Sequence, residues 1–557
     1  MLLKPVCLFF VLSLGNNNFC SSQDDLPEIV TPLGRVRGFW KTLDDRKYAA
    51  FEGIPYAKPP VGHLRFEEAE PIPAWSGTWE ANTLHTCLQA GFLDLDKLLG
   101  EEDCLYLNVY IPEDYVKNPK ALDVIVSIHG GAFMVGSGHM IWTSALLDKD
   151  AVFVSINYRL GILGFLSTED YVIPGNNGMK DQVLAIKWVK DNIASFGGNP
   201  HSVTIVGGSA GGASVHLQYF SPLSKGLFIK GISHSGTALA PWAVRKNALQ
   251  RAKKLAVLVG CPDSTSEELK RCLKQRPAHA LLKQLKHFYG IGDLPFSPFA
   301  PVVERGLANA FLEAEPYHLL KEGKVHDLPW ITSFTVDEGL FPTGYLWHIL
   351  GEINEKWVEL SPELLDYNDT LPASRREVVA KEVLDHYLGP GENINKKNFK
   401  KFTQIFTDRF FAVSAELSTK LQAKVTKSPV YFYIFNYTEG ENKFVDNFPG
   451  TRRVEGACHG EDVFYFYGMS FINPLSAQDK RLRSACHNML YSYANSGNPS
   501  FDGTDTWQPT GSEELTYLFI NGPEYMKLQM SKSVSPIDFW TKLGLLEYEN
   551  LVVKDEL

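Results

Sequence analysis

A short apolar segment that runs directly into a glycine-flanked serine constrains this chain more than any other feature of its sequence. Residues 203–206 have the continuous apolar character of a strand buried on both faces, and Gly207-Gly208-Ser209-Ala210-Gly211 follows at once. Glycine is required on both sides of the serine because larger side chains would clash in so tight a turn between a strand and a helix. The pattern predicts a strained elbow that presents Ser209 above a sheet, as a candidate nucleophile rather than an ordinary turn residue.

Short apolar runs alternate with helical segments along the rest of the chain. The predicted strands are residues 124–128, 151–157, 203–206, 232–234, 330–335 and 430–437. Residues 178–195 repeat apolar side chains at the spacing of one helix face. This alternation predicts an α/β fold with a large, mostly parallel central sheet and helices on both faces. Residues 262–328 are expected to be an insertion beside the site, because no linker rich in Pro, Ser or Gly separates domains.

A second glycine-rich loop follows the predicted strand at residues 124–128. It reads His129-Gly130-Gly131-Ala132, and glycine there lets the backbone approach a ligand closely. The N–H groups of Gly131 and Ala132, together with that of Ala210, are candidate donors to a developing oxyanion. Such a donor is worth about 2.7–4 kcal/mol in the transition state. The alternative interpretation is a tight turn after a strand.

A nucleophilic serine needs a base, and the base needs an acid that orients it. In a strand–elbow–helix enzyme the acid and the histidine follow the serine in the chain. Asp337 and Glu338 come directly after the predicted strand at residues 330–335, and Glu338 is the favoured acid because Gly339 leaves it room to turn inward. Four histidines follow these acids: His348, His386, His459 and His487. His459 is the candidate base, because it lies in a glycine-flanked loop while the others lie in helix-like segments.

The two ends of the chain carry targeting patterns. Residues 1–22 have a charged start, a short apolar run and small residues, which is typical of a signal peptide, with a buried first element as the alternative. Residues 554–557 read Lys-Asp-Glu-Leu, the retrieval signal that a receptor of the endoplasmic reticulum recognises. We therefore expect one domain at residues 23–553, in the lumen of the endoplasmic reticulum and without a stable membrane anchor. Loss or masking of residues 554–557 would let the protein be secreted. Two sequons, at Asn368 and Asn436, fit glycosylation there.

Eight cysteines are present, of which Cys7 and Cys20 are expected to leave with the signal peptide. The remaining six include two pairs that are close in the sequence: Cys87 with Cys104 and Cys261 with Cys272. The pair Cys458 and Cys486 is either bonded or free. No spacing typical of a zinc site occurs, so no metal is expected. The net charge is −10 with no basic cluster, which argues against a nucleic-acid partner. No heptad repeat or other feature predicts an oligomeric state.

At this point the chain resembles the type B carboxylesterases of the α/β-hydrolase superfamily, from residue 28 to about residue 539. Three separate motifs carry the resemblance: residues 51–57, residues 102–112 and residues 196–211. The resemblance implies an esterase with Ser209 as nucleophile, Glu338 as acid and His459 as base. It also implies the oxyanion donors Gly131, Ala132 and Ala210, the disulfides Cys87–Cys104 and Cys261–Cys272, and no cofactor.

Departures from the pattern narrow the subfamily. Cholinesterases carry an acidic residue before the serine and a tryptophan between the first two cysteines, whereas this chain has Gly208 and, in that loop, Phe92 as its one aromatic residue. Gly208 also differs from the glutamine typical of juvenile hormone esterases. Neuroligin-like members have lost the serine, which this chain keeps. The Gly-Gly-Ser-Ala-Gly-Gly elbow is most similar to insect carboxylesterases.

The resemblance implies hydrolysis of small apolar carboxylic esters through an acyl-enzyme. Five aromatic residues fall in segments that line the gorge of such enzymes: Phe133, Trp142, Trp242, Phe296 and Phe299. Packing of the core is the alternative role for each. Two other functions remain open, namely a lipase, thioesterase or acyl-transfer enzyme that uses the same site, and a non-catalytic binding protein of the lumen.

Overall fold

The structure is a computed structural model that describes residues 26–43, 46–91, 94–117, 120–140, 149–439, 456–468, 475–501 and 507–548. The expected signal peptide, the C-terminal tetrapeptide and Trp142 lie outside the described residues. None of the helices in the described part of the chain has the length and apolar character needed to cross a bilayer.

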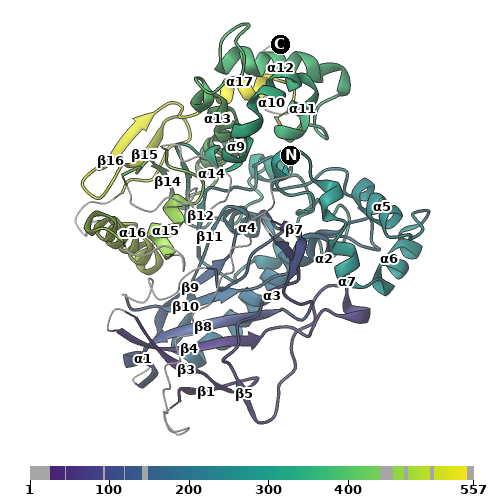
Figure 1. Ribbon diagram of the computed structural model, residues 1–557. Helices are drawn as coiled ribbons and strands as arrows, with labels where there is room; N and C mark the ends of the chain where they lie inside the picture. The colour runs from purple at the N-terminus through teal and green to yellow at the C-terminus, as the bar shows by residue number, and fades with distance from the viewer. Residues whose placement is uncertain are drawn as a thin grey trace, which may run out of the picture.

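One large sheet organises the described residues (Figure 1). In spatial order its strands are β16 (Met526–Ser531), β15 (Leu515–Ile520), β14 (Val430–Phe435), β13 (Trp330–Thr335), β12 (Lys230–His234), β11 (Gly198–Gly208), β9 (Leu122–Ile128), β10 (Val152–Ile156), β8 (Tyr106–Pro112), β4 (Arg46–Pro55) and β3 (Phe39–Leu43). Neighbouring strands run parallel from β10 across to β15, and the strands beyond either end are antiparallel. The predicted mostly parallel sheet is therefore confirmed.

Smaller sheets lie beside the large one: β1 (Glu28–Thr31), β2 (Gly34–Arg37) and β5 (Thr78–Glu80) form one, and β6 (Gln89–Gly91) pairs with β7 (Asp94–Leu99) in another. The α-helices are α1 (Glu113–Lys117), α2 (Gly161–Phe165), α3 (Asn177–Asn192), α4 (Ala210–Phe220), α5 (Ala248–Leu258), α6 (Ser266–Gln275), α7 (Ala278–Leu282), α8 (Pro316–Lys321), α9 (Leu340–Leu346), α10 (Leu350–Glu355), α11 (Trp357–Leu364), α12 (Ala373–Tyr387), α13 (Phe399–Thr407), α14 (Val413–Val425), α15 (Glu461–Tyr467), α16 (Ala477–Ser496) and α17 (Ile537–Lys542).

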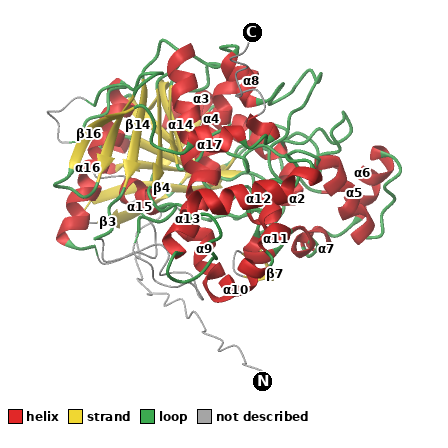
Figure 2. Ribbon diagram, turned by 90° about the horizontal axis from the view of Figure 1, so that it is seen from above, coloured by secondary structure: helices red, strands yellow, loops and turns green. Residues whose placement is uncertain are grey.

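The sheet is buried on both faces, which explains why its strands read as continuous apolar runs. Alternate residues of a strand point to opposite faces. In β9, Val124 and Val126 join the hydrophobic core that contains helices α3 and α4, whereas Ile125 joins the core that contains α15 and α16. Figure 2 shows α16 on one side of the sheet and α3, α4 and α14 on the other.

Strand β11 is longer than the sequence predicts. It begins at Gly198, whereas the apolar run begins at Val203. Gly198 pairs with Leu122, and the register then shifts before Val203 pairs with Val124. The first half of the strand is thus an irregular, polar stretch held by a neighbouring strand, which apolar periodicity does not reveal.

Candidate active site

Ser209 occupies the turn between β11 and α4, as the glycine spacing predicts. Its backbone has φ 58° and ψ −125°, a strained conformation for a residue with a side chain. The Ser209 N–H donates to the His234 carbonyl oxygen over 2.8 Å, which holds the turn against β12. A Cβ on Gly207 would lie 2.5 Å from the backbone of Gly211, and a Cβ on Gly211 would lie 2.1 Å from the Ile128 carbonyl oxygen. Both glycines are therefore required by the close approach of α4 to the sheet.

The glycine-rich loop after β9 lies against this turn. A Cβ on Gly130 would be 3.2 Å from the Ser209 Cβ and 2.6 Å from the Gly208 carbonyl oxygen. The loop has an unusual backbone, with φ of 107° at Gly131, 56° at Ala132 and 61° at Phe133. The candidate oxyanion donors Gly131 and Ala132 are thus carried by a strained loop beside Ser209. The third candidate, Ala210, is the first residue of α4.

Glu338 and His459 meet although 121 residues separate them in the chain. The Nδ1 of His459 hydrogen-bonds to Oε2 of Glu338, and the other carboxylate oxygen accepts the Thr335 N–H over 2.7 Å. Glu338 is fully buried and His459 is 7% exposed. A carboxylate on Nδ1 holds the imidazole in one orientation and leaves its Nε2 for another partner.

The neighbouring carboxylate, Asp337, points elsewhere. The Asp337 side chain packs against Gly456, where an added Cβ would lie 2.7 Å from its Oδ2. The other carboxylate oxygen, Oδ1, is 4.0 Å from the Lys400 ammonium group. Burial raises the pKa of Asp337. Of the two acids that the sequence places after this strand, Glu338 is therefore the one that contacts a histidine.

The segment that carries His459 also touches the elbow. Helix α15 begins two residues after His459, and Val463 on this helix packs so close to Gly208 that a Cβ there would lie 2.7 Å from the Val463 side chain. A longer side chain before the serine would therefore collide with α15. The structure thus brings the serine elbow, the glycine-rich loop and the histidine segment together.

A chain of aromatic rings leads from the predicted gorge residues to His459. The Phe133 ring is 6.4 Å from Trp242, Trp242 is 6.0 Å from Phe411, and Phe411 is 4.6 Å from the His459 ring. On another side Phe341 lies 5.6 Å from His459 and 6.2 Å from Phe296. Phe299 instead stacks edge-on against Phe288.

Phe341 and Phe411 are not among the gorge residues that the sequence predicts. Phe341 lies on α9, three residues after Glu338, and its place near the acid was a signal that could have found it. Phe411 lies in a π-helical turn, Asp408–Ala412, between α13 and α14. Such turns interrupt regular helices, often at functional sites, but no local sequence signal marks this one.

A buried polar cluster behind His459 was also missed. The Tyr433 hydroxyl donates to Oδ2 of Asp462 over 2.6 Å, and His234 contacts the hydroxyls of Tyr433 and Tyr467 over 2.5 and 2.6 Å. Burial raises the pKa of Asp462 to about 6 and lowers the pKa of His234 to about 3. At neutral pH the His234 imidazole is therefore uncharged, whereas Asp462 is mainly a carboxylate that accepts the Tyr433 hydroxyl.

The described cysteines form two disulfides, Cys87–Cys104 and Cys261–Cys272, while Cys458 and Cys486 are buried free thiols. Within the described residues, no group of three His, Cys, Asp or Glu side chains is placed to hold a metal ion.

Comparisons with known proteins show which family the chain resembles. The model of the carboxylesterase family matches residues 25–540. The chain is 38% identical to venom carboxylesterase-6 of Apis mellifera, over 97% of this chain and 98% of the relative, and 38% identical to esterase FE4 of Myzus persicae, over 90% of each. Among solved structures it is similar to juvenile hormone esterase from Manduca sexta with OTFP covalently attached, with a TM-score of 0.82 and 27% identity over 93% of this chain and 99% of that one.

Proposed function

The chain belongs to the carboxylesterase family and is a carboxylic ester hydrolase, and on that premise we propose an acyl-enzyme mechanism in which Ser209, His459 and Glu338 take part. The observation that carries this proposal is the hydrogen bond between Glu338 and His459, because it selects one acid and one of 15 histidines. The strained backbone of Ser209 supports the same assignment.

In this mechanism the Ser209 oxygen attacks the ester carbonyl carbon while Nε2 of His459 takes the hydroxyl proton. Glu338 keeps the proton on Nδ1 and stabilises the imidazolium that forms. His459 then returns the proton to the departing alcohol, and the acyl group stays on Ser209. Water repeats the attack with His459 as base, which releases the carboxylic acid and restores the serine.

The tetrahedral intermediate carries its negative charge on the former carbonyl oxygen. We assign the N–H groups of Gly131, Ala132 and Ala210 to that oxygen. The close approach of Gly130 to the elbow supports the assignment, because an added Cβ on Gly130 would lie 3.2 Å from the Ser209 Cβ. Ala132 has the same backbone N–H as the glycine that relatives carry at this position, but its methyl group narrows the space for the acyl chain.

The aromatic rings around His459 support an apolar ester as substrate. Phe341 and Phe411 pack directly on the imidazole, and Trp242 and Phe133 continue this apolar wall. Aromatic side chains stabilise a bound apolar ligand, because the contact removes apolar surface of both from water. The gorge role of these rings is part of the proposal.

The same proposal places the enzyme in the secretory pathway. It includes removal of residues 1–22, a domain at residues 23–553 and retrieval to the endoplasmic reticulum through residues 554–557. The exposed Asn368 is the better sequon for a glycan, because the Asn436 side chain is half-buried and donates to Asn521 over 3.2 Å.

The first test follows the hydrolysis of 4-nitrophenyl esters, from acetate to palmitate, by the wild type, Ser209→Ala and Ser214→Ala. Ser214 is the control because it is a second serine of this segment, buried within helix α4 rather than in the turn before it. We expect activity at short and medium chains in the wild type and in Ser214→Ala, and a loss of at least about 10⁴-fold in Ser209→Ala.

Activity confined to long acyl chains would replace the carboxylesterase assignment with a lipase. If the wild type were as inactive as Ser209→Ala while both proteins were correctly folded, the catalytic assignment would fail. A non-catalytic binding role would then be the better interpretation.

A further inference from the structure

The loop that carries the candidate oxyanion donors cannot hold its shape by itself. Ala132 and Phe133 both have positive φ, which is costly for residues with side chains and persists only when surrounding contacts enforce it. Inside the loop, the N–H groups of Met134 and Val135 both donate to the Gly131 carbonyl oxygen over 2.9 Å. These contacts close the turn but do not fix it relative to Ser209.

A side chain from another segment supplies two external contacts. The Gln89 amide donates from Nε2 to the Gly136 carbonyl oxygen over 2.8 Å, and its Oε1 accepts the Gly136 N–H over 2.7 Å. Gln89 is 7% exposed, so both bonds are protected from water. A primary amide that bonds both backbone groups of one residue fixes the orientation of that residue as well as its position.

The clamped residue lies directly against the start of the loop. A Cβ on Gly136 would be 2.6 Å from the Gly130 carbonyl oxygen and 2.3 Å from the His129 ring. The His129 ring in turn stacks on Tyr158 at 4.3 Å. Because these backbones are closely packed, we expect a displacement of Gly136 to move Gly130, which lies beside the Ser209 elbow.

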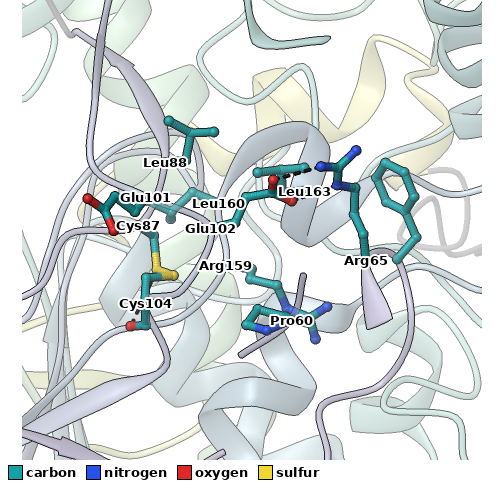
Figure 3. Close-up of a pocket in the computed structure, with 11 residues that line it drawn as sticks. Pro60, Arg65, Cys87, Leu88, Glu101, Glu102, Cys104, Arg159, Leu160 and Leu163 are labelled. Carbon is teal, nitrogen blue, oxygen red and sulfur yellow. Dashed lines mark hydrogen bonds and ion pairs between the residues drawn. A yellow bond between two sulfur atoms is a disulfide. The ribbon is translucent and has the colours of Figure 1, made fainter. Parts of the chain in front are cut away.

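Gln89 is itself anchored on a rigid base. It lies two residues after Cys87, whose disulfide to Cys104 ties β6 to the start of β8, and its Nε2 also donates to the Cys87 carbonyl oxygen over 2.9 Å. Figure 3 shows the Cys87–Cys104 disulfide on one side and Glu102 facing Arg65 on the other. Arg65 and Glu102 form a two-point ion pair at 2.6 and 2.7 Å.

We propose that Gln89 is a positioning residue for the oxyanion hole, and that the Cys87–Cys104 disulfide holds the segment that carries Gln89. Gln89 does not touch the substrate. It holds Gly136, and through Gly136 and Gly130 it sets the distance from the N–H groups of Gly131 and Ala132 to the oxyanion on Ser209. This inference rests on the proposed function of that site.

Three variants test the inference. Gln89→Met keeps the side-chain length and removes both bonds to Gly136. Gln89→Glu keeps the acceptor for the Gly136 N–H but puts a carboxylate oxygen against the Gly136 carbonyl oxygen. Gln182→Met is the matched control, because Gln182 is also buried and its amide contacts Ser214 and Gln218, away from the loop.

The measurements are kcat and KM for 4-nitrophenyl butyrate and the inhibition constant of a trifluoromethyl ketone, which adds to the serine and forms an anionic hemiketal. For both Gln89 variants we expect kcat to fall about tenfold or more, with KM within about twofold, since the hole acts in the transition state. The inhibition constant should rise by the factor by which kcat/KM falls. Gln182→Met should change each value by less than about twofold.

The inference would be overturned if the Gln89 variants kept kcat and the inhibition constant, or changed KM alone. An equal loss of kcat in Gln182→Met would also overturn it. Failure of the proposed function is a different result, because Ser209→Ala would then be as active as the wild type. If neither Gln89 variant folds, amide hydrogen exchange in the wild type decides. The ketone should slow exchange in residues 129–138 and 87–91 together, because coupling between two sites is reciprocal, and unchanged exchange in 87–91 would refute the proposal.

Discussion

At the scale of single residues, the two adjacent acids after β13 point in different directions and have different partners. Glu338 turns inward to His459 and is fixed by the Thr335 N–H, while Asp337 faces Gly456 and the Lys400 ammonium group. The side chains of adjacent residues point in different directions, so only one of the two carboxylates reaches the imidazole. The orientation of the histidine therefore depends on a single carboxylate.

Glu338→Gln should lower kcat by about 10³–10⁴-fold with little change in KM, because an amide neither holds the proton on Nδ1 nor stabilises an imidazolium. Asp337→Asn is the matched control and should stay within about threefold of the wild type. Steady-state kinetics with 4-nitrophenyl butyrate, alongside thermal unfolding to check the fold, measure both. A larger loss in Asp337→Asn than in Glu338→Gln would reverse the assignment of the acid.

At the scale of elements, the site depends on how closely helix α4 approaches strand β9. A Cβ on Gly211 would lie 2.1 Å from the Ile128 carbonyl oxygen, and a Cβ on Gly236 would lie 2.1 Å from the Ser209 carbonyl oxygen. Real Cβ atoms do not come that close to backbone atoms. The position of Ser209 is therefore set by two close approaches, of α4 to β9 and of the elbow to the turn after β12.

Gly211→Ala should push α4 off the sheet, with a loss of more than about 3 kcal/mol of unfolding free energy and of most activity. Gly351→Ala on α10 is the matched control, because nothing lies within 4 Å of its Cβ position. That change should be neutral or stabilising by up to about 1 kcal/mol. Urea unfolding followed by fluorescence compares the two, and equal stabilities would show that α4 can relax away from β9.

At the scale of the whole molecule, the sheet divides the described residues into two cores, and each core encloses one free thiol. Cys458 belongs to the core that contains α3 and α4, and Cys486 to the core that contains α15 and α16. Both are fully buried, and burial raises the pKa of each thiol well above its usual value. The reactive thiolate is therefore scarce on both faces of the sheet.

The native protein without residues 1–22 should consume no thiol reagent at pH 8, and the protein in guanidinium should consume two equivalents, from Cys458 and Cys486. The appearance of both thiols should follow the unfolding curve, because neither core opens without disrupting the shared sheet. Titration with a chromogenic disulfide measures this. One thiol that reacts in the native state would show that its core opens independently, and Cys458→Ala or Cys486→Ala would identify it.

Short-range geometry explains what the sequence by itself determined. The elbow at Ser209, the loop at Gly130 and Gly131, and the strands that precede them follow from local steric limits and from the apolar character of strands buried on both faces. The proposal of His459 as base rests on its loop context and on the resemblance, and His459 contacts Glu338 in the fold. The elbow, the loop and the strands depend on residues within a few positions of one another, so their pattern is visible in the chain.

The tertiary structure alone decided which distant side chains complete the site. Gln89 reaches Gly136 across 47 residues, and the Tyr433 hydroxyl reaches Asp462 across 29. Phe411 reaches His459 from a π-helical turn. None of these contacts has a local signal, because the direction of a side chain depends on the packing of elements that are remote in sequence. Local sterics thus determined where Ser209 lies, whereas packing determined which side chains hold and surround it.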